Sequence, residues 1–169
     1  LDISADASAT IIAKGAFSPT IDQTLTLTGG SSTASTNNSH AMANAILQGG
    51  TSLNLTVKNT QIAPDAILIN GGTASATGGG SGICQSGGGV CAASVALITT
   101  SDQPFQTITI LNEHLTINGG SATASGTSSV ASAIAGIDPR NSPIGVKALA
   151  ITTPGGIDLT SGASAPSAG

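Results

Sequence analysis

The sequence predicts an all-β fold, a β-solenoid (parallel β-helix) made of repeats of about 42 residues. Three observations predict it. One phrase occurs three times, as "LTLTGGSSTAS" at 25–35, "ILINGGTASAT" at 67–77 and "LTINGGSATAS" at 115–125. Within each copy apolar residues recur at every second position, which is the period of a strand with one buried face. A glycine pair follows each strand, and we expect it at a corner of the solenoid, where positive φ angles are needed.

The copies keep a nearly fixed spacing along the chain. The full copies begin at Leu25, Ile67 and Leu115, and weaker copies begin near residue 1 ("LDISADASA") and at 157 ("IDLTSGASA"). The last four starts lie 42, 48 and 42 residues apart, and the longer interval contains a glycine-rich insertion at 78–91. We therefore expect a single repeat domain, residues 1–169, with repeats starting near 1, 25, 67, 115 and 157.

Two further phrases return after each copy. The alanine-rich phrase reads "HAMANAIL" at 40–47, "VCAASVALI" at 90–98 and "VASAIAGI" at 130–137. Alanine also favours helices, but the accompanying Val, Ile, Thr, Ser and glycine residues favour a strand. In that strand the inward residues are small, so that two sheets approach closely: Ala43, Ala45, Ser94, Ala96, Ala131 and Ala133. The other phrase, "LNLTV" (53–57), "TITIL" (107–111) and "LAIT" (149–152), alternates as well.

Composition supports thin, repeated strands. Of the 169 residues 39% are hydrophobic but only 1% are aromatic and 7% charged, against about 25% charged in a typical domain. A conventional core is difficult to build from these residues, and the hydrophobic content is too high for a disordered polymer. Two points stay open. One repeat could form two coils, or one coil with a hairpin that folds outward, and an antiparallel β-sandwich of repeated hairpins is the alternative fold.

The run "LNLTVKNTQI" followed by "INGGTASA" resembles the repeats of right-handed parallel β-helix passengers and filamentous-haemagglutinin-like surface exoproteins of bacteria. The resemblance covers most of the chain and consists of a pattern rather than of any rare residue. It implies a secreted adhesin or a surface fibre, located outside the cell or on the bacterial surface. The 42-residue period is longer than the usual coil of such families.

The two cysteines bear on the compartment. Cys84 and Cys91 lie in the insertion "GICQSGGGVCA", close enough in sequence to form a disulfide-closed loop. We expect that bond, which favours an oxidising location outside the cytoplasm. Unpaired thiols or a metal site are the alternatives. The sequence shows no signal peptide and no membrane span, and it starts without methionine. We expect a processed product or a segment of a longer array.

The sequence offers no catalytic constellation, so we expect no enzyme and no cofactor. Its eight acidic residues are scattered singly, and no tryptophan or tyrosine provides a platform for sugars. The densest polar pair, Glu113-His114, has no identifiable partner for acid/base work, and we expect a solvated corner there. Four basic residues and a net charge of -4 do not favour nucleic acid as a partner.

Three functions remain, and the first is a structural subunit of an extracellular fibre or matrix. Similar strand phrases at the two ends predict head-to-tail assembly, in which residues 157–165 pair with residues 1–9 or 25–30 of another copy. The assembly edges would be Leu1, Ile3, Leu25, Leu27, Ile157, Leu159, Ala163 and Ala165.

The second possible function is a surface adhesin whose partner is a host cell or a glycan. The third is an ice-binding solenoid, suggested by Thr24/Thr26/Thr28 and Thr107/Thr109, although the equivalent pairs Asn54/Thr56 and Ala150/Thr152 break the threonine pattern.

Overall fold

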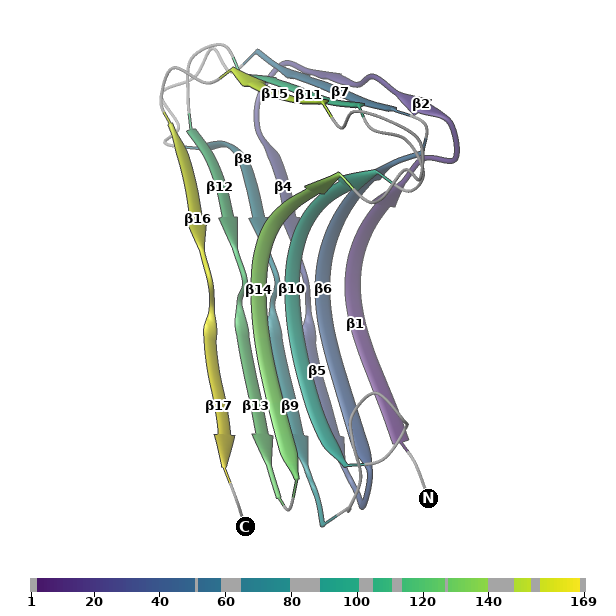
Figure 1. Cartoon of the computed structure of the whole chain (residues 1–169), viewed down its shortest axis with the longest axis vertical. Coiled ribbons are helices and arrows are strands. Elements are labelled where there is room, and N and C mark those ends of the chain that lie inside the picture. Colours follow the sequence, from purple (N-terminus) through teal and green to yellow (C-terminus); the bar gives the residue numbers. More distant parts are fainter. Residues whose placement is uncertain are drawn as a thin grey trace.

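The chain folds into four parallel β-sheets in which strands from successive repeats lie side by side (Figure 1). This computed structural model describes residues 3–50, 52–58, 65–79, 89–100, 105–110, 114–126, 128–139, 148–152 and 156–167. The described residues form seventeen strands and no helix. The alternation of apolar and small polar residues therefore gives strands throughout, including the alanine-rich phrases that could also have formed helices.

Two of the sheets, which we call A and B, contain the alanine-rich phrases and the third phrase. Sheet A has the spatial order β1 (Ile3–Ile12), β6 (Ser39–Gly49), β10 (Val90–Thr100) and β14 (Ser129–Pro139). Sheet B runs from β2 (Ala16–Phe17) and β3 (Thr20–Ile21) to β7 (Ser52–Val57), β11 (Phe105–Ile110) and β15 (Ala148–Thr152). Pro19 separates β2 from β3, because proline has no N–H for a continuous strand ladder.

The other two sheets, C and D, contain the phrase with the glycine pair. Sheet C is made of β4 (Leu25–Thr28), β8 (Asp65–Asn70), β12 (His114–Asn118) and β16 (Ile157–Thr160). Sheet D is made of β5 (Ser31–Ser35), β9 (Thr73–Thr77), β13 (Ser121–Ser125) and β17 (Ala163–Ser167). The half of each phrase before the glycines thus belongs to one sheet, and the half after them to the next.

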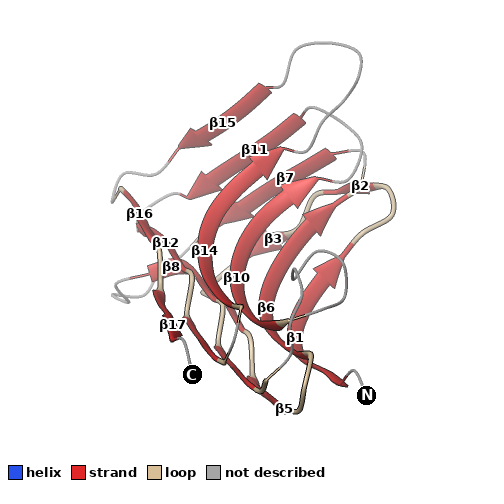
Figure 2. Cartoon of the chain, turned by 60° about the horizontal axis from the view of Figure 1, so that its bottom comes forward, coloured by secondary structure: helices blue, strands red, loops and turns tan. Residues whose placement is uncertain are grey.

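The chain visits the sheets in the same order, A, B, C and D, four times in succession. We call each passage a layer: layer 1 is β1–β5, layer 2 is β6–β9, layer 3 is β10–β13 and layer 4 is β14–β17. Leu25 pairs with Ile67, and Leu115 pairs with both Ile67 and Ile157, so one sequence repeat advances the chain by one layer. Every described strand pair is parallel, and the antiparallel sandwich of hairpins is therefore wrong. Figure 2 shows the layers following one another.

The strand at the start of the chain belongs to sheet A. Residues 3–12 pair in register with residues 39–48, the alanine-rich phrase of layer 2. The segment "ISADASA" (3–9) is therefore equivalent to the alanine-rich phrase of layer 2 rather than to "LTLTGGSSTAS". The two segments share their alternation, and sequence alone did not separate them.

The interior is divided into a wide part and a thin part. In the wide part sheets A, B and C surround leucine and isoleucine side chains, among them Leu47, Leu55 and Ile69. In the thin part sheet A faces sheet D across a seam made almost entirely of alanine: Ala34, Ala41, Ala43, Ala74, Ala76, Ala92, Ala122 and Ala124, with Val90. Ala43, Ala45 and Ala96 are fully buried, and Ala131 and Ala133 pack against the seam from layer 4. The predicted inward alanines are thus confirmed.

The glycine pairs join sheets C and D rather than forming sharp corners. In Figure 1, β12 and β13 run nearly in line, with only a narrow waist between them. Gly72 and Gly120 have φ angles of 82° and 72°, and the first glycine of each pair has no positive φ. Its small size has a different use, because sheet A crosses directly against it: a Cβ on Gly119 would lie 2.9 Å from the backbone nitrogen of Ile134.

Hydroxyl groups connect sheet A to sheet D and to the glycine pairs. Ser32 Oγ donates to the carbonyl of Ala5 at 2.9 Å, and Ser94 Oγ donates to the carbonyl of Gly72 at 3.1 Å. Ser39 Oγ donates to the carbonyl of Thr77 at 2.9 Å. These bonds satisfy buried hydroxyls, which would otherwise carry a desolvation cost.

Candidate assembly edges

Each sheet of the described structure ends in two strands that have a neighbour on one side only. One edge, the N-terminal edge, consists of layer 1, and the other, the C-terminal edge, consists of layer 4. Such strands present backbone N–H and C=O groups that can pair with another strand. Both edges comprise the same four sheets in the same order, so each strand of one edge has a counterpart in the other.

The predicted residues of sheet C occupy both edges. Leu25, Ile67, Leu115 and Ile157 form one inward column across the layers, and Leu27, Ile69, Ile117 and Leu159 form the next. The members in layers 2 and 3 are completely buried. In layer 4 the side chains of Ile157 and Leu159 are 42% and 52% exposed, whereas Leu27 in layer 1 is only 9% exposed. The C-terminal edge therefore leaves apolar surface in contact with water.

The predicted residues of sheets A and D are placed differently. Ile3 pairs with Ser39 in β1, and Leu1 lies outside the described residues. Ala163 and Ala165 belong to the edge strand β17, but the N–H of Ala163 already bonds the carbonyl of Gly120 in layer 3, at 3.2 Å. N–H groups alternate in direction along a strand. The positions of β17 that direct their N–H groups to the open edge are therefore 164 and 166.

The structure also determines which strands could meet in a head-to-tail stack. The edge opposite β16 and β17 is formed by β4 and β5, while β1 lies opposite β14. Residues 157–165 therefore correspond to residues 25–33 of a following copy, and residues 129–138 correspond to 3–12. Of the two pairings expected from the sequence, only the one with residues 25–30 is compatible with this sheet order.

Two residues of the C-terminal edge were missed by the sequence reasoning. Ser161 stands opposite Gly119, where the three preceding layers have glycine, and Pro166 stands opposite Ala124. Pro166 occupies one of the positions whose N–H would point to the open edge. A proline on an edge strand is a recognised signal against further pairing, and it was visible in the sequence.

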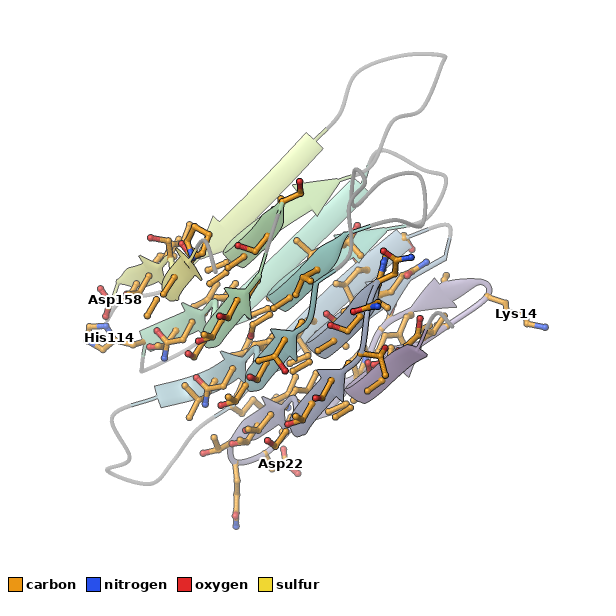
Figure 3. The ribbon with its side chains drawn as sticks, turned by 90° about the horizontal axis from the view of Figure 1, so that it is seen from below. Lys14, Asp22, His114 and Asp158 are labelled. Carbon is orange, nitrogen blue, oxygen red and sulfur yellow. The ribbon has the colours of Figure 1, made fainter. Side chains whose placement is uncertain are left out.

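The described charged groups lie on the outside of the sheets. Figure 3 shows His114 and Asp158 beside each other, remote from Lys14 and Asp22 in layer 1. His114 Nδ1 is 3.7 Å from an Asp158 carboxylate oxygen, so this contact connects layers 3 and 4. The His114 side chain is 42% exposed and the Asp158 side chain is 67% exposed, and surface pairs of this kind contribute little stability. Glu113, the expected companion of His114, lies outside the described residues.

One of the two cysteines lies within the described residues. Cys91 lies in β10, in register with His40 of β6 and Val130 of β14. Cys84 lies outside the described residues, so the Cys84–Cys91 disulfide stays a prediction. Within the described part of the chain, no group of three or more His, Cys, Asp and Glu residues is placed to hold a metal ion.

The outward face of sheet D carries a regular array of hydroxyl groups. Its members form three in-register columns over layers 1 to 3: Ser31, Thr73 and Ser121; Thr33, Ser75 and Thr123; Ser35, Thr77 and Ser125. In layer 4 the first two columns end in Ala163 and Ala165. The face is therefore uncharged and built from side chains of nearly equal size.

No helix in the described residues is long and apolar enough to cross a membrane. Comparison of the chain with protein-family models, with curated proteins and with solved structures finds no match.

Proposed function

We propose that the protein is a structural subunit of an extracellular fibre or matrix, with a closed β-solenoid fold whose layers stack head to tail from copy to copy. The solenoid is supported by four passages through the same four parallel sheets. The extracellular location is supported by the expected disulfide, since such bonds persist in oxidising compartments. The partner of each copy is therefore another copy, and no cofactor is involved.

One observation carries the proposal: the exposure of Ile157 and Leu159 at the C-terminal edge, in columns whose members in layers 2 and 3 are completely buried. A second copy stacked on this edge would place its Leu25 and Leu27 over them and continue both columns. The contact would repeat the packing that already exists between layers 3 and 4. Burying an apolar side chain of this size contributes about 1.5–3 kcal/mol.

Deletion of residues 157–169 tests the proposal. We expect the purified protein to form filaments by negative-stain electron microscopy and to sediment as a concentration-dependent series of oligomers. The deletion variant should remain β-rich by circular dichroism but should sediment as a monomer, because β14 and β15 remain and hold the strands of a second copy one layer away from β12 and β13. Filaments formed by the deletion variant would contradict the proposed edge.

Two point variants distinguish packing at the edge from non-specific hydrophobic association. The double variant I157S/L159S removes the two exposed apolar side chains of the C-terminal edge and should weaken assembly. Met42→Ser is the matched control, because Met42 is 43% exposed but lies on the outer face of sheet A, away from both edges. Wild-type protein that stays monomeric and instead binds cells or glycans would favour the adhesin function.

The hydroxyl array of sheet D favours a second candidate function, the binding of ice. Strands lie about 4.8 Å apart and alternate residues about 6.6 Å apart, so hydroxyls in register form a two-dimensional lattice that can order water. These residues differ from the threonines that suggested ice binding in the sequence. Thermal hysteresis measurements test this function: the triple variant T33V/S75V/T123V should reduce hysteresis if the array binds ice, and wild-type protein without hysteresis would exclude it.

A further inference from the structure

The two glycines of each pair face opposite directions along the stack. The first glycine faces the following layer: a Cβ on Gly29 would lie 2.8 Å from the carbonyl oxygen of Asn44, and one on Gly71 would lie 2.6 Å from Ser94 Oγ. Asn44 and Ser94 belong to sheet A of the next layer. Internal layers therefore exclude any side chain at the first position.

The second glycine faces the preceding layer. A Cβ on Gly72 would collide with the carbonyl oxygen of Gly29, and one on Gly120 would collide with that of Gly72. Gly30 occupies this position in layer 1, where the nearest atom to such a Cβ is the Ala7 Cβ at 3.2 Å. The N-terminal edge therefore keeps a residue that leaves space for a preceding layer.

At the C-terminal edge the first position is not glycine. Ser161 stands there, and its Cβ occupies the direction in which Gly29, Gly71 and Gly119 each meet the next layer. In a head-to-tail stack the next layer would be layer 1 of another copy, and Ser8 of that copy would continue the column that contains Asn44 and Ile134. Ser161 must therefore displace that strand from the position it takes in internal layers.

Pro166 weakens the same edge by a second, independent route. The equivalent residues Ala34, Ala76 and Ala124 have an N–H that can be donated to the next layer, whereas proline has none. A copy stacked on β17 would thus lack one ladder hydrogen bond. In the stacked copy, the backbone carbonyl of Thr33 would have no N–H donor.

We propose that the C-terminal edge docks the N-terminal edge of a second copy and that Ser161 and Pro166 weaken this contact, so that assembly is reversible and dependent on concentration. This inference rests on the proposed fibre function and adds its regulation. The exposed Ile157 and Leu159 attract the second copy, while Ser161 and Pro166 keep its strands from reaching the spacing of internal layers. The copy-to-copy contact is therefore weaker than any layer-to-layer contact within the chain.

The double variant S161G/P166A tests the inference, because it gives layer 4 the residues that internal layers have at these positions. The full chain and the variant are compared by sedimentation velocity over a range of concentrations. We expect the variant to lower the critical concentration for assembly at least about tenfold, which corresponds to about 1.4 kcal/mol. Ser161→Ala is the matched control: it keeps the Cβ and should leave the critical concentration unchanged.

The outcomes separate this inference from the proposed function. Wild-type filaments with a critical concentration that S161G/P166A does not lower would overturn the inference and leave the fibre function in place. A wild type that is monomeric at every concentration, with a variant that forms filaments, would overturn both the fibre function and the reversible docking, because Ser161 and Pro166 would then block assembly rather than weaken it. Monomers of both proteins at every concentration would overturn both.

Discussion

Ala43 lies in the alanine seam, where sheet A faces sheet D, and its side chain has no exposed surface. The seam is lined by alanine, and sheet A passes so close to the glycine pairs that a Cβ there would clash, so the seam has no space for a larger side chain. We predict that Ala43→Leu lowers the free energy of unfolding by roughly 1–3 kcal/mol or more, as overpacking does. Urea denaturation measures this change.

Met42→Leu is the control for this prediction. It introduces the same side chain one residue away, on the outward and exposed face of β6, and should change stability by less than about 0.5 kcal/mol. Equal effects of the two substitutions would contradict the inward assignment of Ala43. Ala133, which is only partly buried at the edge of the seam, should tolerate leucine better than Ala43 does.

Ser94 is the buried serine in a column that otherwise holds Ala7, Ala43 and Ala133. Its hydroxyl donates to the carbonyl of Gly72, which also accepts the N–H of Ser121 at 2.8 Å. We predict that Ser94→Ala costs about 0.5–1.5 kcal/mol, the net value of one hydrogen bond. Ser132→Ala, on the outward face of β14, should have no measurable effect by the same thermal or urea titration. A variant as stable as wild type would show that Ser94 only fills space.

At the scale of the element, alternation determined where the strands lie but not how they pair. Leu53-Asn54-Leu55 alternates in the same way whether its neighbours are parallel or antiparallel, because the period of two belongs to the single strand. The fixed spacing of repeats favoured parallel pairing, and Leu25, Ile67, Leu115 and Ile157 do stack in one column.

The glycine pairs show the limit of such reasoning. Positive φ was expected at the pairs, and Gly72 and Gly120 have it, but the first glycine is required by sheet A of the next layer, which comes from a distant part of the chain. No local pattern reports this contact. For the same reason, "IDLTSGASA" was read simply as one more copy of the repeat. The replacement of its first glycine by Ser161 has a consequence only once the layers are stacked.

The strand β10 provides a test of the predicted disulfide. Its register is fixed by continuous pairing with β6 and β14 from Cys91 onward. We predict that the double variant C84S/C91S keeps this register and the assembly state, with a stability loss of at most about 2–3 kcal/mol from loop closure. Circular dichroism and sedimentation measure the outcome. Collapse of the fold on reduction of the wild type would show that the bond supports the whole layer.

The molecule as a whole is organised along one axis, so that each layer contacts mainly the layers next to it. Asn118 Nδ2 donates to Asn70 Oδ1 at 2.9 Å, and the leucine and isoleucine columns pass through all four layers. In such architectures stability is roughly a sum of terms for each layer and for each contact between neighbours. Layers should therefore be exchangeable, provided that the column residues and the first glycine are preserved.

Insertion of an additional layer tests this organisation directly. A second copy of residues 36–77, placed after Thr77, adds one complete passage through sheets A to D and repeats the junction that already follows Ser35. Gly71 of the first copy then faces Asn44 of the second, as Gly29 faces Asn44 in the natural chain.

We predict that the protein with the inserted layer folds and melts at the same or a higher temperature. It should be longer by about 4.8 Å along the stack, which is the spacing of neighbouring strands. Thermal melting by circular dichroism and small-angle X-ray scattering measure the two changes. The control omits Leu68 from the inserted copy, which makes Ile67 and Ile69 adjacent so that only one of them can face inward. An insertion that unfolds the protein as much as this control does would show that the layers depend on contacts beyond their nearest neighbours.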